Sequence, residues 1–127
     1  MSQLVFVYGS LKRGYALHWL MKDAEFSGRA VTRPLYRIFH LGSYPGLVEW
    51  PEGLPVEGEL YRVNEECLKS LDQAEGVAEG LYARRDIHLQ NPPVDQSTQA
   101  WFWLGPVAGF LDCGTHWPPE SFMDADE

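Results

Sequence analysis

The sequence predicts an α+β fold: one small, mixed, β-barrel-like sheet with two main helices on one side. Short apolar runs between glycines and prolines, roughly seven of them, indicate the strands. Only two stretches carry a helical period, and strands and helices do not alternate regularly, which disfavours a doubly wound parallel sheet. A chain of 127 residues suits one domain that buries a core without disulfides or a metal.

The opening of the chain predicts a strand, a glycine-bracketed loop and a helix. Residues 4–8 read Leu-Val-Phe-Val-Tyr, a β-branched and aromatic run typical of a buried strand. The loop that follows begins at Gly9 and ends at Gly14. The predicted helix beyond it rests on apolar residues at the spacing i, i+3 and i+4: Leu17, Leu20 and Met21.

The middle and end of the chain predict the remaining strands. Tyr44-Pro45-Gly46 has the signature of a type II turn, in which glycine takes a positive φ. The segment from Gly105 onward is expected to be loop-like. The expected strands cover residues 29–32, 35–39, 56–63, 82–89 and 100–104.

The second helix has clear end signals. Asn64 suits the N-cap, and two glutamates follow it in the first turn, where the helix dipole favours negative charge. The helix is expected to end near Glu75, with Gly76 as the C′ residue.

Composition and charge exclude several classes of partner. The formal net charge is −8 and the sequence pI is near 4.9, so phosphate backbones and anionic lipid are repelled. We therefore expect no nucleic-acid partner and no membrane partner. Cys67 and Cys113 lack C-x-x-C spacing and are expected as free thiols. The start of the chain lacks a signal peptide, which predicts a cytoplasmic protein.

The loop from Gly9 to Gly14 is the first candidate binding element. Its G-x-x-x-x-G spacing matches a phosphate-binding loop, but Tyr15 and Ala16 stand where Lys and Ser/Thr are required. What remains is a strand-to-helix turn whose backbone N–H groups can converge on an anion such as a carboxylate. The alternative is a tight turn that uses glycine only for its positive φ.

Glu75 is the candidate catalytic residue. It shares the apolar face of its helix with Leu68 and Leu71 at i, i+3 and i+7. A carboxylate there is costly unless it is paired or functional, and desolvation would raise its pKa toward neutrality. The alternative is that Glu75 reaches solvent or pairs with Arg84 or Arg85.

Other groups of residues are weaker candidates for a metal-binding or catalytic site. The four histidines are dispersed without metal-ligand spacing, so no metal is expected. Ser10 does not lie in a G-x-S-x-G elbow. Cys113 and His116 form only a weak candidate nucleophile pair. The aromatic run at residues 101–103 and Trp117 are expected in the core and a pocket wall, because no basic groove accompanies them.

Several segments together resemble the γ-glutamylcyclotransferase family, including γ-glutamylamine cyclotransferases and AIG2-like proteins. The resemblance covers about residues 4 to 104, with the motifs in the family's order. It departs from the family pattern at Gln73-Ala74 and matches only loosely at residues 113–117. The segments are Val5–Gly14 with Tyr-Gly-Ser-Leu, Tyr44-Pro45-Gly46, Val56–Tyr61, Leu71–Gly76 with Leu-Asp-x-x-Glu, and Tyr82-Ala83-Arg84.

The resemblance implies a cofactor-independent enzyme that releases 5-oxoproline and an amine or amino acid from a small γ-glutamyl substrate. It makes Glu75 the general acid and base, with Glu79 as its competitor. The alternative function is a non-catalytic metabolite sensor of the same fold. We expect one domain over residues 1–117 and a flexible acidic tail over 118–127. The implied substrate-binding residues are Tyr8, Gly9, Ser10, Leu11 and Tyr82.

Overall fold

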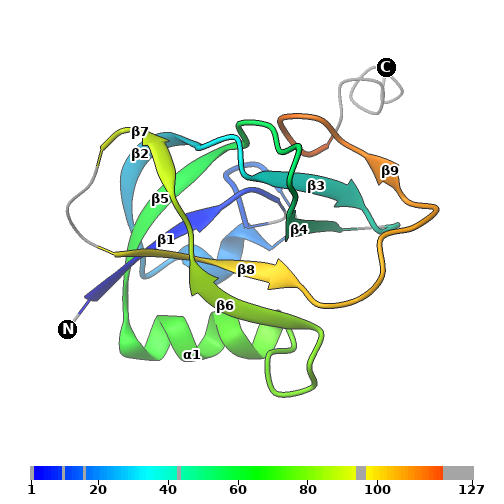
Figure 1. The fold of residues 1–127 in the computed structure, drawn as a ribbon. Coiled ribbons are helices and arrows are strands. Elements are labelled where there is room, and N and C mark those ends of the chain that lie inside the picture. The colour runs from blue at the N-terminus through cyan, green and yellow to red at the C-terminus, as the bar shows by residue number, and fades with distance from the viewer. Residues whose placement is uncertain (1, 10, 16, 43, 94–96, 119–127) are drawn as a thin grey trace.

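The fold is one mixed nine-stranded sheet with a single α-helix against it (Figure 1). The computed structural model describes residues 2–9, 11–15, 17–42, 44–93 and 97–118. Helix α1 (Glu65–Ala74) and the 3₁₀ helix η1 (His18–Met21) are the helices of the described residues. The strands are β1 (Ser2–Val7), β2 (Glu25–Thr32), β3 (Tyr36–His40), β4 (Pro45–Glu49), β5 (Glu57–Asn64), β6 (Tyr82–Asp86), β7 (Leu89–Asn91), β8 (Thr98–Trp103) and β9 (Leu111–Asp112).

The strand order places β1 and β8 at the centre of the sheet. The order is β7-β2-β5-β1-β8-β4-β3-β9, and β6 pairs with β8 off this path. β1 runs antiparallel to β5 and parallel to β8, and β4 is also parallel to β8. Among the described strands, β7 and β9 end the order and do not pair with each other. The α+β class is confirmed, but the barrel-like sheet is not a closed barrel.

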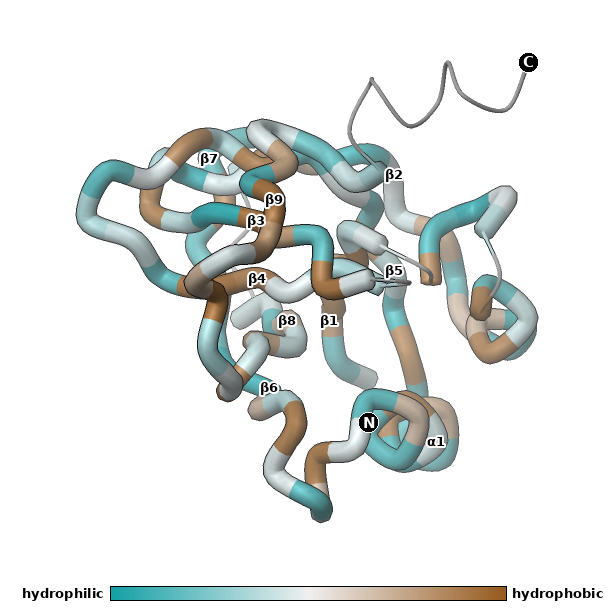
Figure 2. The backbone as a smooth tube through the Cα atoms, turned by 90° about the vertical axis from the view of Figure 1, so that its right-hand side faces the viewer, coloured by the Kyte–Doolittle hydropathy of each residue, from teal (hydrophilic) through white to brown (hydrophobic). Residues whose placement is uncertain are grey.

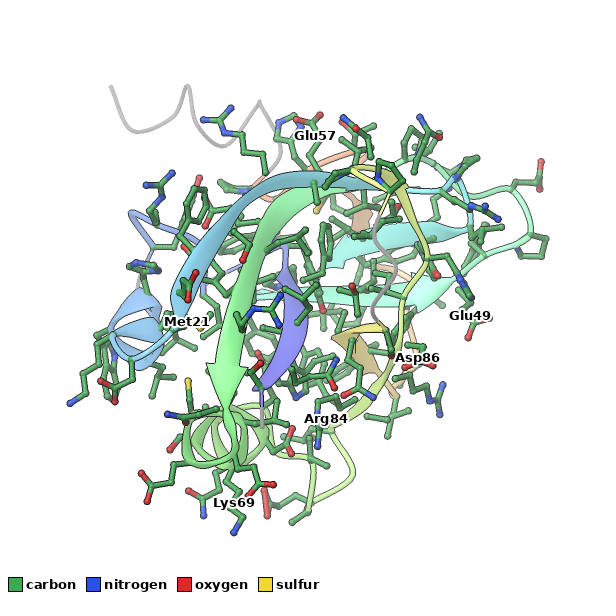
Figure 3. The ribbon with its side chains drawn as sticks, turned by 90° about the vertical axis from the view of Figure 1, so that its left-hand side faces the viewer. Met21, Glu49, Glu57, Lys69, Arg84 and Asp86 are labelled. Atoms are coloured by element: carbon green, nitrogen blue, oxygen red, sulfur yellow. The ribbon has the colours of Figure 1, made fainter. Side chains whose placement is uncertain are left out.

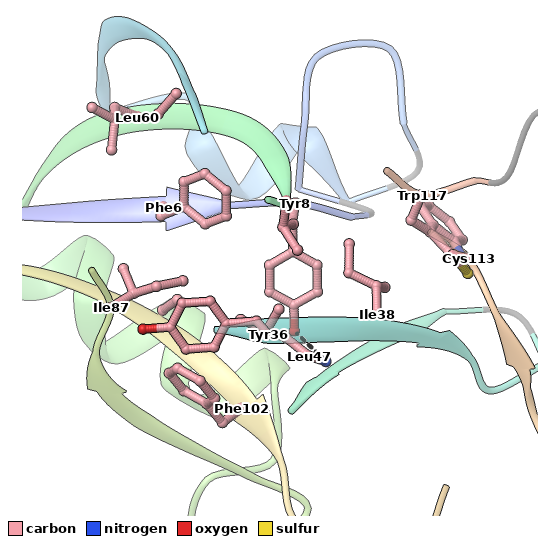
Figure 4. Close-up of a cluster of buried hydrophobic side chains, with 13 residues drawn as sticks. Phe6, Tyr8, Tyr36, Ile38, Leu47, Leu60, Ile87, Phe102, Cys113 and Trp117 are labelled. Atoms are coloured by element: carbon pink, nitrogen blue, oxygen red, sulfur yellow. Dashed lines mark hydrogen bonds between the residues drawn. The ribbon is translucent and has the colours of Figure 1, made fainter. Parts of the chain in front are cut away.

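The central strands are buried on both faces, which explains the continuous apolar run near the N-terminus. Phe6 of β1 lies in one apolar cluster, together with Leu47 and Phe102 of neighbouring strands (Figure 4). Val5 and Val7 lie in a second cluster with Leu71 of α1. The alternation follows from the two-residue period of a strand, since successive side chains point to opposite faces.

Helix α1 begins and ends where the sequence predicts. The Asn64 side chain accepts a hydrogen bond of 2.8 Å from the Cys67 backbone N–H. Gly76 follows the helix with φ of +69°. Leu71 is buried against the sheet, while Figure 3 shows Lys69 extending from the outer side of the helix. Figure 2 shows both hydrophilic and hydrophobic residues along α1, as an amphipathic helix requires.

The prediction of two main helices is wrong, because the first helical stretch forms only the short 3₁₀ helix η1. Its bonds span three residues, as in the bond of 3.0 Å from the Leu20 N–H to the Leu17 carbonyl. Gly14, with φ of +88°, interrupts helical backbone upstream. A segment this short forms too few hydrogen bonds to offset the unfavourable free energy of nucleating an α-helix. A single 3₁₀ turn is enough to bury Met21.

Further boundaries differ from the sequence-based expectation, including the start of β2 at Glu25 rather than at residue 29. The strand expected over residues 82–89 is divided into β6 and β7, because the chain leaves β8 after Asp86 and pairs with β2 from Leu89. The turn expected at residues 44–46 is instead the start of β4, and Gly46 lacks a positive φ. Pro45 is tolerated there as the first residue of a strand.

The segment after β8 packs back onto the sheet. Within the expected loop, β9 pairs with β3. The Glu57 N–H also donates a hydrogen bond of 2.7 Å to the Thr115 carbonyl. Trp117 is buried in the first cluster. Cys67 and Cys113 are both free, as predicted. The expected acidic tail lies, from residue 119, outside the described residues.

Candidate active site

A cavity opens where β1 and β4 diverge from β8. The antiparallel partner β6 occupies one edge of β8 from residue 99 to 103. On the other edge, β1 pairs only through Thr98 and Gln99, and β4 only through Phe102. The cavity beside this fork has a volume of about 230 Å³. That volume suits a metabolite of modest size, since drug-sized ligands occupy roughly 300–1,000 Å³.

The hydroxyl groups of Tyr8 and Tyr82 form hydrogen bonds that connect β4 to β8 and β6 beside the cavity. Tyr8 donates a 2.6 Å hydrogen bond to the Trp101 carbonyl. It also accepts one of 3.3 Å from the Leu47 N–H (Figure 4). The Tyr82 hydroxyl donates a hydrogen bond of 2.6 Å to the Pro45 carbonyl. Burial raises the pKa of both phenols, so both stay neutral. Both rings line the cavity, but each hydroxyl proton is already committed to a carbonyl oxygen.

The loop after β1 forms one wall of the cavity. Gly9 and Leu11 both line it, and Ser10 lies outside the described residues. Gly9 does not have a positive φ, and a Cβ atom there would overlap the Pro45 ring. Glycine is therefore needed at position 9 because it lets the backbone approach the Pro45 ring closely, and not for a positive φ.

The same loop offers unused hydrogen-bond donors. Within the described part of the chain, the backbone N–H of Gly9 and that of Leu11 have no acceptor. The turn itself closes through the Lys12 N–H, which donates 3.0 Å to the Gly9 carbonyl. Two neighbouring free N–H groups beside a cavity can bind a carboxylate.

Glu75 follows the last residue of α1 and lines the same cavity. Its side chain is half-buried, and no hydrogen bond or ion pair joins its carboxyl group to another described residue. Burial first, and the charge of Asp72 second, raise the pKa of Glu75 from about 4.5 to about 7. A carboxyl group with this pKa can both accept and release a proton near neutral pH.

Arg84, which the sequence offered as an alternative partner for Glu75, binds the carboxylate of Asp72 instead. Arg84 donates from Nε to Asp72 Oδ1 at 3.0 Å and from Nη2 to Oδ2 at 3.1 Å. Trp101 Nε1 also donates to Asp72 Oδ1, at 2.8 Å. Figure 3 shows Arg84 beside α1. The alternative pairing of Glu75 with Arg84 is therefore wrong.

The expectation that Trp101 lies in the core and a pocket wall is confirmed, but sequence reasoning missed its hydrogen bond to Asp72 and the supporting role of Asp72. One signal was present, because Asp72 precedes Glu75 by three residues and so lies one helical turn away. The periodicity could not indicate which carboxylate Arg84 would bind, since that depends on the register of β6 against β8.

The weaker candidates do not form sites. The Cys113 thiol lies 3.9 Å from the Leu111 carbonyl, and burial raises its pKa to about 11, away from a reactive thiolate. His116 contacts Thr115 at 3.3 Å instead. Glu79 is exposed in the turn after α1. Among the described residues no three His, Cys, Asp or Glu side chains could hold a metal ion, and no described helix could span a membrane.

The fold and cavity define a small α+β domain in which one protonatable carboxyl group shares a cavity with two residues whose backbone N–H groups have no acceptor among the described residues. A sequence model of the gamma-glutamyl cyclotransferase, AIG2-like family matches residues 5–117. The chain belongs to this family, which confirms the resemblance seen in the motifs.

Relatives and solved structures agree with this assignment. The gamma-glutamylaminecyclotransferase of Bos taurus is 34% identical over 124 residues, which are 91% of this chain and 68% of that protein. An AIG2-like protein from Mus musculus superposes with a TM-score of 0.69 at 28% identity, covering 94% of this chain and 97% of that one. Protein ytfP from Escherichia coli has a TM-score of 0.68 at 33% identity, covering 98% and 100%.

Some matches are partial. A Vibrio cholerae relative is 43% identical over 77 residues, which are 61% of this chain and 65% of that protein. An Arabidopsis thaliana relative is 42% identical over 96 residues, which are 69% of this chain and only 51% of that protein.

Proposed function

We propose that this protein is a γ-glutamyl cyclotransferase that releases 5-oxoproline and a free amine from a small γ-glutamyl compound. The observation that carries the proposal is that Glu75, Gly9 and Leu11 line one cavity, while the N–H groups of Gly9 and Leu11 have no acceptor among the described residues. Membership of the family supports the same reaction. We propose no cofactor and no nucleic-acid or membrane partner. A cytoplasmic location stays a prediction, with which the two free thiols agree.

The reaction begins with substrate binding. The α-carboxylate of the glutamyl group accepts hydrogen bonds from the Gly9 and Leu11 N–H groups. The rings of Tyr8 and Tyr82 pack beside the glutamyl carbons and exclude water. Folding the substrate in this way brings its own amine toward its γ-carbonyl carbon, which supplies the proximity contribution to the rate.

Glu75 then transfers two protons in turn from the substrate's amine to the leaving nitrogen. As a carboxylate it removes one proton from the substrate's α-ammonium group, and the amine nitrogen forms a bond to the γ-carbonyl carbon. As a carboxylic acid it gives that proton to the leaving nitrogen, and the bond between the γ-carbon and this nitrogen breaks. Glu75, again a carboxylate, takes the second proton from the ring nitrogen and passes it to the departing amine. The products are 5-oxoproline and the amine as its ammonium ion, and Glu75 is again a carboxylate.

The test is a turnover assay on a panel of γ-glutamyl amines and γ-glutamyl dipeptides, with 5-oxoproline followed by mass spectrometry. We expect release from at least one compound, unchanged after exhaustive chelation with EDTA. Loss of release with EDTA that returns with Zn²⁺ or Mn²⁺ would contradict the cofactor-independent reaction. Binding of γ-glutamyl compounds without any release would favour the sensor instead.

A further inference from the structure

The substrate loop, defined as residues 9–14, has to hold two backbone N–H groups in fixed directions. The N–H groups of Gly9 and Leu11 have no acceptor among the described residues, and both residues line the cavity. The described residues of this loop belong to no helix or strand. A carboxylate is bound tightly only where its donors are already ordered, because ordering a loose loop during binding costs free energy. Contacts from outside the loop must therefore supply this order.

His18, the first residue of η1, contacts the substrate loop through its imidazole ring. Its Nδ1 atom lies 2.8 Å from the Leu11 carbonyl oxygen. Because a carbonyl oxygen can only accept, Nδ1 carries the hydrogen and donates it. Among the described residues no other donor reaches this oxygen. The ring of His18 thus satisfies a carbonyl group that belongs to one of the two candidate binding residues.

The bond from His18 fixes the orientation of one peptide group in the loop. This peptide group joins the Leu11 carbonyl to the Lys12 N–H, which donates 3.0 Å to the Gly9 carbonyl. His18 therefore holds its oxygen, and Gly9 holds its hydrogen. Because a peptide group is planar, two bonds on its opposite edges determine how it is turned. The turn from Gly9 to Lys12 is held in one conformation, and the N–H groups of Gly9 and Leu11 stay unused.

The sheet anchors only the later part of the loop. Glu59 on β5 accepts hydrogen bonds of 3.0 Å from the Arg13 N–H and 2.9 Å from the Tyr61 hydroxyl. Its side chain is 14% exposed, so this contact is largely shielded from water. In the part of the chain that the structure describes, no sheet side chain reaches the Leu11 carbonyl. The short helix η1 therefore supplies a contact that the sheet does not.

The imidazole ring is itself held in place by the rest of η1. The His18 N–H donates 3.1 Å to the Tyr15 carbonyl, which closes the turn before the helix. The helix ends at Met21, which is 2% exposed and is labelled in Figure 3. The centroid of the half-buried His18 ring lies 6.0 Å from that of the Tyr61 ring. The donor is thus anchored by a buried methionine and a neighbouring aromatic ring.

We propose that His18 is a positioning residue, which holds the Leu11 carbonyl so that the Gly9 and Leu11 N–H groups stay directed at the α-carboxylate of the substrate. This inference rests on the proposed function. His18 is not among the described residues that line the cavity, so it acts through the loop and does not touch the substrate. Loss of its hydrogen bond should weaken recognition of the carboxylate and leave proton transfer by Glu75 unchanged.

Two pairs of compounds measure recognition of the carboxylate. γ-Glutamylmethylamide and γ-glutamylalanine are each compared with an analogue in which a carboxamide replaces the α-carboxylate of the glutamyl group. Ring closure joins the α-amine to the γ-carbonyl carbon, so the analogues can also cyclise, and they release the carboxamide of 5-oxoproline. For the wild type we expect kcat/KM to be at least ~10-fold higher for the carboxylate of a pair, because a charged acceptor forms the stronger hydrogen bonds. Comparing this ratio between variants cancels the difference in amine basicity.

Two variants of His18 separate its hydrogen bond from its packing. The amide nitrogen of asparagine is as many bonds from the backbone as Nδ1, so His18→Asn can still donate, whereas His18→Leu keeps bulk beside Tyr61 without a donor. We expect His18→Leu to raise KM ~10-fold, to keep kcat within about twofold and to lower the carboxylate preference several-fold. His18→Asn should keep most of this preference.

The control and the check of folding complete the experiment. His88→Leu is the control for loss of a histidine, because His88 is exposed and lies outside the cavity. Circular dichroism melts of all variants check that the fold is intact. If His18→Leu fails to fold, His18→Gln takes its place, because the amide nitrogen of glutamine lies one bond further from the backbone than Nδ1.

The outcomes separate this proposal from the proposed function. If the wild type releases 5-oxoproline but His18→Leu keeps the wild-type KM and carboxylate preference, the role of His18 is wrong and the cyclotransferase proposal stands. The role is equally wrong if His18→Asn loses the preference as fully as His18→Leu, or if His88→Leu has the same effect. It is also wrong if the wild type cyclises both members of a pair equally well. If the wild type cyclises none of the four compounds, both proposals fall.

Discussion

Asp72 and Glu75 lie one turn apart at the end of α1, yet among the described residues only Asp72 is bound by other side chains. Asp72 receives hydrogen bonds from Arg84 at 3.0 and 3.1 Å and from Trp101 at 2.8 Å. Glu75 lines the cavity without such partners among the described residues. The negative charge of Asp72 contributes to the raised pKa of Glu75. One carboxylate is thus structural, and the other is left available for proton transfer.

Replacing the proposed base should separate folding from turnover. We expect Glu75→Gln to fold and bind substrate but to lower kcat by at least ~10², because an amide cannot shuttle a proton. Glu79→Gln is the control and should be nearly silent, since Glu79 is exposed. If the two variants exchanged phenotypes, Glu79 would be the base. If neither changed turnover, the sensor alternative would be favoured.

The rate should depend on the protonation of Glu75. Because its pKa is about 7 and the base must be ionised, kcat/KM should fall about tenfold per pH unit below this pKa. Asp72→Asn removes the second cause of the raised pKa, so this acidic limb should move to lower pH. Asp86→Asn, an exposed charge on β6, should leave the profile unchanged. If the acidic limb of the Asp72→Asn profile stayed at the wild-type pH, the charge of Asp72 would not contribute to the raised pKa of Glu75.

Stability should respond to the same titration with a defined sign. The folded protein binds the Glu75 proton more tightly than the unfolded chain does, so stability falls as pH rises from about 4.5 to about 7. The penalty above this window is at most about 3 kcal/mol, because part of the side chain meets solvent. Glu75→Gln should therefore gain Tm over the wild type at pH 8 and not at pH 4. Equal differences at both pH values would contradict this.

The close approach of Gly9 to Pro45 predicts a coupled pair. Gly9→Ala places a methyl group against Cγ and Cδ of the proline, so we expect a loss of about 1–3 kcal/mol in the free energy of unfolding and a higher KM. Pro45→Ala removes these two atoms and leaves Cβ at an ordinary 3.7 Å. The double variant should recover part of both losses in a double-mutant cycle. Additive effects would mean that the two residues do not press on each other.

The bond between Lys12 and Trp117 predicts that the C-terminal segment supports the substrate loop. Lys12 Nζ donates 2.6 Å to the Trp117 carbonyl, and the ammonium lies 5.0 Å from the centroid of the Tyr15 ring. Lys12→Met should cost about 1 kcal/mol of stability and raise KM with little change in kcat. Lys69→Met, on the exposed side of α1, is the control for loss of a lysine. An unchanged KM in Lys12→Met would exclude this support.

Local signals in the sequence determined much of the fold. The β-branched run at residues 4–8 predicted the buried central strand, and Asn64 and Gly76 predicted the ends of α1. These features depend on neighbours within a few residues, such as the bond from the Cys67 N–H to Asn64. The motifs also identified the family, because they retain its order along the chain. Glu75 as the catalytic residue stays a prediction until its variants are measured.

Only the tertiary structure decided how these elements meet. Gly9 is required because Pro45, 36 residues later, lies against it, and Arg84 binds Asp72 because β6 pairs with β8 in one register. The position of Leu81 likewise depends on a turn folding back over Gly76. Periodicity determines which face of an element is buried, since it records the repeat of the backbone. It contains no information on which distant side chain packs there, because register and packing across the whole sheet set that choice.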